Sequence, residues 1–372
     1  MMSDERVLEI AVLPGDGIGH ELLEACLQVL DELQKSMDGV RLSYTHIRAG
    51  AEFYQETGKD ITGEDFERAR AADAILLGAM GHPDIRYPDG TEIAPHLTMR
   101  TEFDIFASIR PVKAYPNIPR PLADPRSADI DLVIIRECSE GLFYLRHEGK
   151  ITDDKEARDT LVMTRKGCER LFDFAFNLSR QRKEKGGKGM VSCVDKSNVL
   201  RSYAFFRKVF AERAELYPDI IADYRYVDAM ALDLIRKPWD YDVLVAENMF
   251  ADILSDQGGG IIGGMGMASC AELGYNHGIF QPAHGSAPDI AGQDKANPIA
   301  TFLSAAMMLR WLGTQHDLES CTEAAAKLEK GIESGFAYNR IRPMEFGGPD
   351  GTKSVRDTVL SLLDNEGHFR EK

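Results

Sequence analysis

Several features that mark specialised classes of protein are missing from this chain of 372 residues. No apolar run reaches the roughly 18 residues that a membrane-spanning helix needs. Met1–Arg6 is polar and lacks the apolar stretch of a secretory signal. Neither a repeat of fixed period nor a low-complexity segment is present. The sequence therefore predicts a soluble, cytoplasmic, globular protein without a membrane partner.

Positive charge is scarce as well, because 44 lysines and arginines stand against 60 acidic residues and give a net charge of −16. Such an acidic surface argues against nucleic acid as a partner. An enzyme of acidic substrates would have to gather arginines locally against this field. The six cysteines form no C-x-x-C pair, which predicts buried free thiols rather than a thiolate metal site.

What the sequence does contain is an alternation of short β-branched runs and longer amphipathic segments, which predicts an α/β fold. The length is comfortable for two such domains. Apolar residues recur at helical spacing in His20–Met37 and Lys166–Lys185. Asn117–Asp129 is expected to be a loop, and glycine-rich Gln257–Gly266 a crossing between domains or a close backbone approach. The expected strands are Val7–Leu13, Val40–Ile47, Ala74–Gly78, Phe106–Arg110, Leu132–Arg136, Met190–Val194 and Asp242–Ala246.

The glycine-rich segment Gly15–Gly19 lies between an expected strand and an expected helix. Its spacing is G-x-G-x-G rather than the G-x-G-x-x-G of dinucleotide-binding turns, and no acidic residue ends a strand about twenty residues later. A plain tight turn is at least as good an interpretation as a nucleotide site.

Asp252 and Asp256 are four residues apart, so a helix would place both carboxylates on one face. A hard cation such as Mg²⁺ or Mn²⁺ would relieve their repulsion. The alternative is a pair of solvated surface acids.

Other polar residues follow expected strands or turns. Each of them has a functional interpretation and, as the alternative, an interpretation as an ordinary surface residue. Arginine forks bind carboxylates, and a lysine in a metal-bearing cleft can act as a base, but each could also be an ordinary surface group. The small side chains of the loop His284–Gly292 could admit a ligand to the backbone, or could simply form a surface loop. The residues concerned outside that loop are Arg100, Arg110, Arg136, Lys196 and Asn297.

Taken together and in this order, these motifs resemble the isocitrate/isopropylmalate dehydrogenase family of β-decarboxylating dehydrogenases, and most of all its isopropylmalate, D-malate and tartrate dehydrogenases. The similarity runs from Leu13–Gly19 to Glu345–Gly348, with Asp252–Asp256 and His284–Gly292 as its most specific parts. It implies a two-domain α/β fold with mixed sheets flanked by helices, which is not a Rossmann fold. Residues 1–105 and 263–372 would form the cofactor domain, and residues 106–262 the substrate, metal and dimer domain.

The resemblance also implies an NAD-dependent oxidative decarboxylation of a substituted (2R)-malate in a homodimer with shared active sites. A metal lowers the pKa of the C2 hydroxyl and stabilises the enolate that remains after CO₂ leaves. Lysine and aspartate from the partner subunit would accept the hydroxyl proton. By position, the carboxylate clamp is Arg100, Arg110 and Arg136, the base pair is Lys196 with Asp228, and the metal ligands are Asp228, Asp252 and Asp256.

The loop after His284 resembles the adenosine-binding loop of family members that use NAD. Asp289 and Ile290 stand where NADP-using members have lysine and tyrosine, and Glu345 stands where NAD-using members have aspartate. A carboxylate near the ribose accepts hydrogen bonds from the 2′-hydroxyl and repels a 2′-phosphate. The implied cofactor residues are His284, Gly285, Ser286, Ala287, Asp289, Ile290, Asn297 and Glu345.

The sequence departs from the family pattern at the acid that protonates C3. The family tyrosine corresponds to Phe143, which has no proton to give, while Tyr144 is adjacent. Tyr144 can serve as the acid only if a bulge re-aims it, and otherwise water or another acid must do so. Gln281 also replaces an expected glutamate and keeps its hydrogen-bonding capacity.

A second departure concerns the substrate. The positions that form an apolar pocket in isopropylmalate enzymes read Ile93, His96 and Leu97 here. Because histidine makes that pocket more polar, D-malate, tartrate or another polar malate is as plausible as 3-isopropylmalate. A catalytically weak regulatory or binding subunit of the same family is the alternative function.

Overall fold

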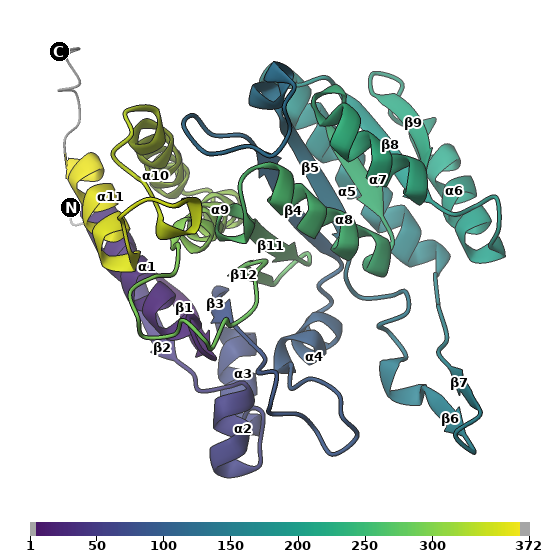
Figure 1. The fold of residues 1–372 in the computed structure, drawn as a ribbon, viewed down its shortest axis with the longest axis horizontal. Helices are drawn as coiled ribbons and strands as arrows, with labels where there is room; N and C mark the ends of the chain where they lie inside the picture. The colour runs from purple at the N-terminus through teal and green to yellow at the C-terminus, as the bar shows by residue number, and fades with distance from the viewer. Residues whose placement is uncertain (1–4, 365–372) are drawn as a thin grey trace.

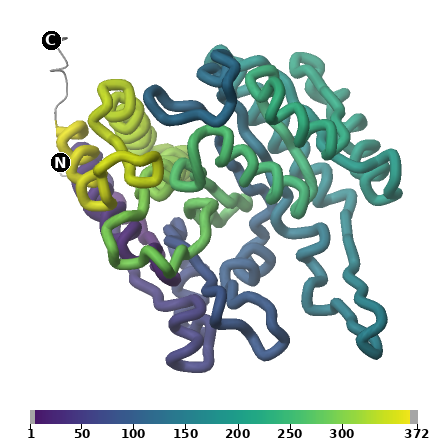
Figure 2. The backbone as a smooth tube through the Cα atoms, viewed as in Figure 1, coloured from purple at the N-terminus to yellow at the C-terminus, as the bar shows by residue number. Residues whose placement is uncertain are grey.

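A computed structural model describes residues 5–364 and shows one ten-stranded sheet running through the molecule (Figure 1). The strand order is β2-β1-β3-β12-β11-β4-β5-β10-β8-β9, and a separate hairpin, β6–β7, protrudes from the body (Figure 2). The strands are β1 (Arg6–Gly15), β2 (Val40–His46), β3 (Ala74–Ala79), β4 (Ala107–Lys113), β5 (Asp131–Glu137), β6 (Lys150–Thr152), β7 (Glu156–Arg158), β8 (Met190–Asp195), β9 (Ile221–Tyr226), β10 (Val243–Ala246), β11 (Ser269–Leu273) and β12 (Gly278–Pro282).

The sheet is parallel towards both ends and antiparallel at its centre. β1 pairs in parallel with β2 and β3, and β10 in parallel with β5 and β8. β11 runs antiparallel to both β12 and β4, and β4 antiparallel to β5. The predicted α/β fold with a mixed sheet is therefore confirmed. The proposed domain boundary falls at the β4–β11 pair, across which the sheet is continuous, so the division into two domains stays a prediction.

Helices cover both faces of the sheet, as the alternation of side chains along β10 shows. Val243 and Val245 face a cluster formed with α5 and α6, whereas Leu244 and Ala246 face the larger core that includes α7 and α8. At the other end, α1 packs against α11, and α9 lies on β11 and β12 beneath α10. The helices are α1 (Gly19–Gln34), α2 (Ala51–Thr57), α3 (Gly63–Ala71), α4 (Pro95–Glu102), α5 (Arg165–Glu184), α6 (Arg201–Ala214), α7 (Val227–Arg236), α8 (Asn248–Ile261), α9 (Ile299–His316), α10 (Glu319–Ala337) and α11 (Thr352–Asp364).

The two helices expected from apolar periodicity are both present. α1 buries Leu22, Cys26, Val29 and Leu33 on one side, and α5 buries its own apolar stripe in the same way. α5 begins after Thr164, whose hydroxyl accepts a hydrogen bond from a backbone N–H in the first turn. Within residues 5–364, none of the helices combines the length and apolarity required to cross a bilayer.

Two expected loops are shorter than predicted. α8 continues to Ile261, so the first half of Gln257–Gly266 is helical and the crossing begins after it. Gly258 explains the difference, because a Cβ there would lie 2.6 Å from the side chain of Val112 on β4, and glycine lets the helix approach the sheet. The expected loop Asn117–Asp129 ends in a 3₁₀ turn over Pro125–Asp129.

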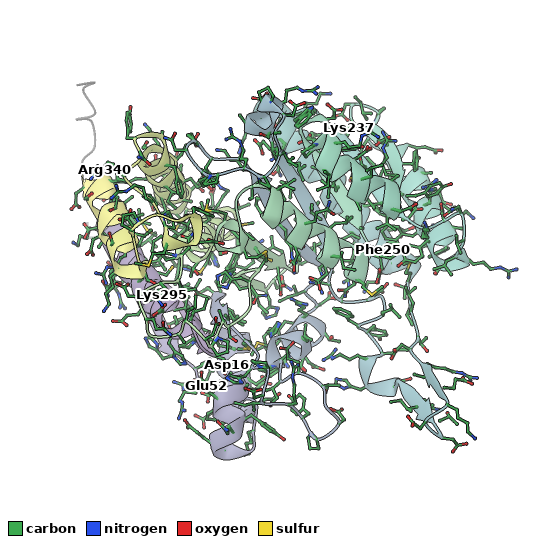
Figure 3. The ribbon with its side chains drawn as sticks, viewed as in Figure 1. Asp16, Glu52, Lys237, Phe250, Lys295 and Arg340 are labelled. Carbon is green, nitrogen blue, oxygen red and sulfur yellow. The ribbon has the colours of Figure 1, made fainter. Side chains whose placement is uncertain are left out.

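The Gly15–Gly19 segment is a tight turn built around a buried carboxylate. Gly15 and Gly17 have φ values of +72° and +54°, which favour glycine. The carboxylate of Asp16 accepts hydrogen bonds from the backbone N–H groups of Ala51 (3.0 Å) and Glu52 (2.8 Å). Figure 3 labels Asp16 and Glu52, which lie close together. The turn thus fixes the end of β1 against the start of α2.

Candidate active site

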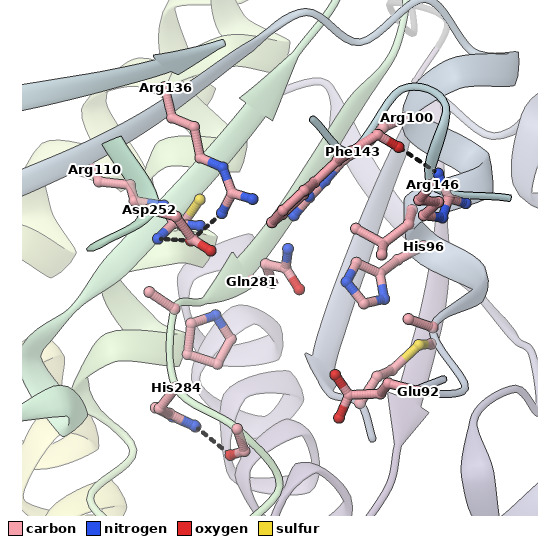
Figure 4. A pocket seen from close by; sticks show the side chains of 17 residues that line it. Glu92, His96, Arg100, Arg110, Arg136, Phe143, Arg146, Asp252, Gln281 and His284 are labelled. Atoms are coloured by element: carbon pink, nitrogen blue, oxygen red, sulfur yellow. Dashed lines mark hydrogen bonds and ion pairs between the residues drawn. The ribbon is translucent and has the colours of Figure 1, made fainter. Parts of the chain in front are cut away.

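A cavity of about 480 Å³ lies beside the central strands, where the two parallel parts of the sheet meet. Four arginines line it: Arg100 from α4, Arg110 from β4, Arg136 from β5 and Arg146 from the loop after β5 (Figure 4). The three arginines that the sequence selected as a carboxylate clamp are therefore neighbours in one concave site. They lie there although the chain as a whole is strongly acidic.

Arg100 is held by a carboxylate inside the protein. Its Nε donates to Glu272 of β11 at 2.7 Å, a second guanidinium nitrogen donates to the other oxygen, and Gln281 also donates to Glu272 at 3.0 Å. Burial alone would raise the pKa of Glu272, but the charge and hydrogen bonds of Arg100 bring it to about 2. The pair is thus ionised, and Gln281 helps to fix it.

Arg110 and Arg136 converge on Asp252 of α8. Arg110 donates to the carboxylate at 3.0 Å, Arg136 donates to the same oxygen, and Asn248 accepts from the Nε of Arg136 at 2.9 Å. Burial, together with the charges of Arg110 and Arg100, lowers the pKa of Arg136 to about 10. Such crowding of guanidinium groups favours the arrival of an anion with several oxygens, such as a dicarboxylate.

Asp252 and Asp256 lie on one face of α8, as their spacing predicted. Asp256 is 3.8 Å from Arg110, and its pKa is raised by partial burial and by the neighbouring carboxylate of Asp252, against the opposing charge of Arg110. A divalent cation between the two carboxylates would remove their repulsion, so the pair fits a metal. Within residues 5–364 of one chain, however, no three potential ligands gather into a metal site.

The predicted third ligand, Asp228, lies elsewhere in the chain together with the predicted base. The Nζ of Lys196 is 2.6 Å from the carboxylate of Asp228, whose pKa this hydrogen bond lowers. Asp228 is at the start of α7 and exposed, and neither residue lines the cavity. The expected metal set of Asp228, Asp252 and Asp256 therefore does not form within the described residues of one chain.

The predicted acid, Tyr144, is also outside the cavity. The turn after β5 places the ring of Phe143 in the cavity wall, with the guanidinium carbon of Arg136 5.4 Å from the ring centroid. Tyr144 is 45% exposed and is not part of the wall. The local backbone thus does not re-aim Tyr144 in the way that its proposed role requires.

The loop that follows β12 joins the cavity to the turn at the start of α1. The carbonyl of Ser286 accepts from the backbone N–H of Ile18 at 2.8 Å, and Ala287 has a φ of +37°. His284 and Gly285 line the cavity. The Nε2 atom of His284 is buried without a hydrogen-bond partner among the described residues, so this loop offers a polar atom to a ligand.

The remaining predicted cofactor residues lie farther along this surface. Asp289 is exposed, and Ile290 packs against the start of α1. The carboxylate of Glu345 accepts hydrogen bonds from the side chain of Asn297 (2.9 Å) and the backbone N–H of Gly266 (3.1 Å). The structure therefore joins Asn297 and Glu345 and leaves the carboxylate of Asp289 open to solvent.

Sequence reasoning missed two charged residues of the cavity wall and misplaced one apolar residue. Arg146 and Glu92 line the cavity, whereas Ile93, expected in the substrate pocket, is fully buried outside it. His96 and Leu97 do line it, as expected. No periodicity or motif singles out Arg146, because it follows a turn that no local pattern defines.

Comparison with known proteins agrees with this geometry. Residues 9–359 match a family sequence model described as isocitrate/isopropylmalate dehydrogenase. The chain is 42% identical over 361 residues to a 3-isopropylmalate/3-methylmalate dehydrogenase of Methanocaldococcus jannaschii, which covers 96% of this chain and 99% of that protein. It is 40% identical to a 3-isopropylmalate dehydrogenase of Heyndrickxia coagulans, over 96% of this chain and 97% of that one.

Solved structures show the same arrangement of the chain. An isocitrate dehydrogenase from Methylococcus capsulatus superposes with a TM-score of 0.84 at 29% identity, covering 96% of this chain and 100% of that one. A β-decarboxylating dehydrogenase from Thermococcus kodakarensis superposes with a TM-score of 0.76 at 30% identity, covering 98% and 100%.

Proposed function

This chain belongs to the isocitrate/isopropylmalate dehydrogenase family, and from that premise we propose that it catalyses oxidative decarboxylation of a (2R)-malate such as D-malate, tartrate or 3-isopropylmalate. The observation that carries the proposal is the convergence of Arg100, Arg110 and Arg136 on one cavity beside Asp252. NAD is the proposed hydride acceptor, and Mg²⁺ or Mn²⁺ the proposed metal.

The arginines hold the two carboxylates of the substrate and orient C2. Arg110 and Arg136 come from adjacent strands of a rigid sheet, so their guanidinium groups are positioned before the substrate arrives. Arg100 is fixed by Glu272 and adds positive charge from α4. The carboxylate of Asp252 lies between Arg110 and Arg136 and accepts one hydrogen bond from each, which leaves further donors of both guanidinium groups for the substrate.

The metal would be held by Asp252 and Asp256 of one chain and by Asp228 of a second copy. When bound, it supplies Lewis-acid polarisation of the C2 oxygen. Lys196 of the second copy, hydrogen-bonded to Asp228, would take the hydroxyl proton, and NAD, when bound, would supply the acceptor for the C2 hydride. The β-keto acid that results loses CO₂, and C3 is then protonated.

The second copy is supported by apolar side chains exposed on the helices that present these residues. Leu232 and Ile235 on α7 are 52% and 48% exposed, and Ile253 on α8 is 62% exposed. α7 and α8 pack beside each other, and Gln257 of α8 donates to the carbonyl of Ala231 on α7. A homodimer that covers this surface would bring Lys196 and Asp228 towards a neighbouring cavity.

NAD would bind along the loop after β12. His284, Gly285, Ser286 and Ala287 would contact it near the cavity, and Asn297 with Glu345 would frame the adenosine. The exposed carboxylates of Asp289 and Glu345 favour a free 2′-hydroxyl over a 2′-phosphate. Ile290 would contribute apolar contact. When bound, NAD accepts the hydride.

Protonation of C3 is the step for which the cavity lacks a side chain. Phe143 has no acidic proton, and Tyr144 would have to enter the cavity through a movement of its turn. In the arrangement of the single chain, water must donate this proton. The same observation supports a second function, that of a catalytically weak regulatory subunit.

The test is NADH formation in the presence of Mn²⁺ with D-malate, tartrate and 3-isopropylmalate. Arg136→Met should reduce kcat/KM at least about a hundredfold, because it removes a charged hydrogen-bond donor from the substrate. Arg158→Met, an equivalent change on the exposed β7 strand, should have no effect. Absence of turnover by the unaltered protein, with substrate binding retained, would establish the regulatory function instead.

A further inference from the structure

One arginine of the cavity, Arg146, has no carboxylate partner among the described residues. Arg100 is paired with Glu272, and Arg110 and Arg136 are paired with Asp252. Among residues 5–364, no acidic side chain forms an ion pair with Arg146. Within that described part of the chain, its one hydrogen bond runs from a terminal nitrogen to the carbonyl of Phe143 at 3.2 Å, which leaves most of its donors free.

The surroundings of Arg146 make the lack of a carboxylate partner costly in free energy. The side chain is half-buried, and its pKa is lowered by that burial and then by the nearby charge of Arg100. A guanidinium placed beside another one, without an anion of its own, is stabilised when a ligand brings oxygen atoms to it. The other three arginines each have a carboxylate partner among the described residues, so Arg146 is the one of the four that depends on a ligand for its counter-charge.

His96 adds a second unsatisfied polar atom to the same part of the cavity. Its Nδ1 is buried without a hydrogen-bond partner among the described residues. Burial, and then the charge of Arg100, lowers the pKa of His96 to about 3, so its ring is neutral at pH 7. Figure 4 shows His96 and Arg146 on the side of the cavity opposite Arg110, Arg136 and Asp252.

We propose that Arg146 and His96 form a subsite for an oxygen-bearing substituent on C3 of the substrate, either a hydroxyl or a carboxylate. The inference rests on the proposed function, in which Arg110 and Arg136 hold the malate backbone on the opposite side. A substituent at C3 then points across the cavity towards Arg146. The substrate class is accordingly a malate with a polar C3 group, rather than one with an alkyl group.

The subsite would discriminate between polar and apolar C3 groups because hydrogen-bond donors that are left unpaired cost free energy. An isopropyl group would displace water from Arg146 and would offer a hydrogen bond neither to Arg146 nor to the Nδ1 of His96. A site that pairs with a polar substrate group therefore rejects an apolar analogue more strongly than an apolar pocket rejects a polar one.

The experiment compares four substrates in the full-length protein with Mn²⁺ and NAD: D-malate without a C3 substituent, tartrate, isocitrate and 3-isopropylmalate. The variants are Arg146→Met, Arg146→Lys and, as the matched control in the same connection between β5 and α5, Arg158→Met. For the unaltered protein, kcat/KM for tartrate or isocitrate should exceed that for 3-isopropylmalate at least about tenfold. Whichever of the two is preferred identifies the hydroxyl or the carboxylate as the group bound.

Arg146→Met should lower kcat/KM for the preferred oxygenated substrate at least about tenfold and change that for D-malate less than about threefold. Arg146→Lys should recover part of the loss, and Arg158→Met should match the unaltered protein. Near-normal turnover of D-malate also shows that the variant is folded. Equal efficiency with 3-isopropylmalate, or an equal loss on all substrates including D-malate, would overturn the inference and leave the proposed function standing.

A binding measurement separates failure of the inference from failure of the proposed function. If no substrate is turned over, the proposed function fails, and calorimetric titration of tartrate, isocitrate and 3-isopropylmalate decides the subsite by itself. Tighter binding of an oxygenated ligand that is lost in Arg146→Met supports the subsite. Equal binding by both proteins, or no binding, overturns it.

Discussion

At the scale of single residues, the cavity depends on how each buried cation is neutralised. Arg100 and Glu272 are almost completely buried and satisfy each other, whereas Asp252 serves two arginines and is partly open to solvent. A buried pair that loses one member leaves an uncompensated charge in an apolar environment. The two arrangements therefore differ in purpose: the first maintains the fold, and the second remains available to ligands.

Removing the carboxylate of Glu272 should destabilise the protein. We expect Glu272→Gln to lower the free energy of unfolding by about 3–5 kcal/mol, because Arg100 would remain buried without its counter-charge. Urea unfolding followed by circular dichroism measures the change. Glu212→Gln, which breaks an exposed pair with Arg165, serves as the control and should cost less than about 1 kcal/mol. Equal effects of the two substitutions would contradict the expectation.

The same pair predicts a pH dependence of stability. The pKa of Glu272 is about 2 in the folded protein and about 4.3 in an unfolded chain. Because the folded value is the lower one, the stabilisation is fully present above about pH 4.3 and is lost as the pH falls towards 2. The difference in unfolding free energy between the unaltered protein and Glu272→Gln should thus stay constant down to about pH 4.5 and shrink below it. A difference that shrinks already near neutral pH would show that Glu272 is not held by Arg100.

Phe143 predicts which chemical step is slow. In Phe143→Tyr the new hydroxyl would extend into the cavity beside Arg136, and a positioned acid speeds proton transfer by about a hundredfold or more. We expect faster steady-state release of the decarboxylated product without faster hydride transfer. Stopped-flow absorbance of NADH measures the hydride step, and product assays measure the whole cycle. Tyr144→Phe should change neither, and faster hydride transfer in Phe143→Tyr would argue against a missing acid.

At the scale of helices and strands, the periodicity of apolar residues predicted the amphipathic helices, because local sequence determines them. α1 and α5 bury apolar stripes at three- and four-residue spacing, and their limits agree closely with expectation. The largely buried α9 carries no comparable pattern, because most of its sides face the protein, and no helix was expected there. β11 and β12 were missed too, since short buried strands lack a distinctive period.

Prediction of the candidate site from the sequence is limited in the same way to what local spacing determines. The four-residue spacing of Asp252 and Asp256 was enough to place both on one face of α8, because a helix fixes that relation locally. Their nearness to Arg110 and Arg136 depends on the order of strands, which spacing does not contain. Only the resemblance to a family supplied that relation, and it gave no indication of Arg146.

The paired aspartates of α8 predict a measurable metal effect. Mn²⁺ should raise the melting temperature of the unaltered protein, since binding to the folded state stabilises it. Asp256→Asn removes one hard ligand, and we expect at least about a tenfold loss of Mn²⁺ affinity and a smaller thermal shift. Differential scanning fluorimetry over a series of Mn²⁺ concentrations measures both. Asp240→Asn, an exposed acid beyond α7, should behave as the unaltered protein does, and a normal response of Asp256→Asn would exclude this residue as a ligand.

At the scale of the whole molecule, the net charge of −16 and the arginine-lined cavity influence a ligand over different distances. Salt screens charges beyond about 8 Å at physiological ionic strength, so a dicarboxylate inside the cavity senses the nearby guanidinium groups far more than the distant acidic surface. The acidic surface keeps the chain soluble, and the four arginines make one place on it attractive to anions. The arrangement also explains why bulk composition, which argues against a nucleic-acid partner, gives no sign of this local cluster of positive charge.

The separation of Lys196 and Asp228 from the cavity predicts that activity requires two chains. If each site combines the arginines of one chain with the lysine of another, Arg136→Met and Lys196→Met should each be inactive alone, because every site in either homodimer lacks a required group. In a hybrid dimer, the chain that carries Lys196→Met still has its arginines, and its partner still has Lys196, so one of the two sites is complete. Mixing the two variants after reversible dissociation should therefore restore about a quarter of the unaltered activity, because half of the dimers are hybrid and each has one complete site.

Activity is assayed after mixing, with each variant carried alone through the same dissociation as the control, and size-exclusion chromatography with light scattering verifies that dimers re-form. Dimers that re-form without recovering activity would mean that Lys196 reaches the cavity of its own chain, and the shared site would have to be abandoned.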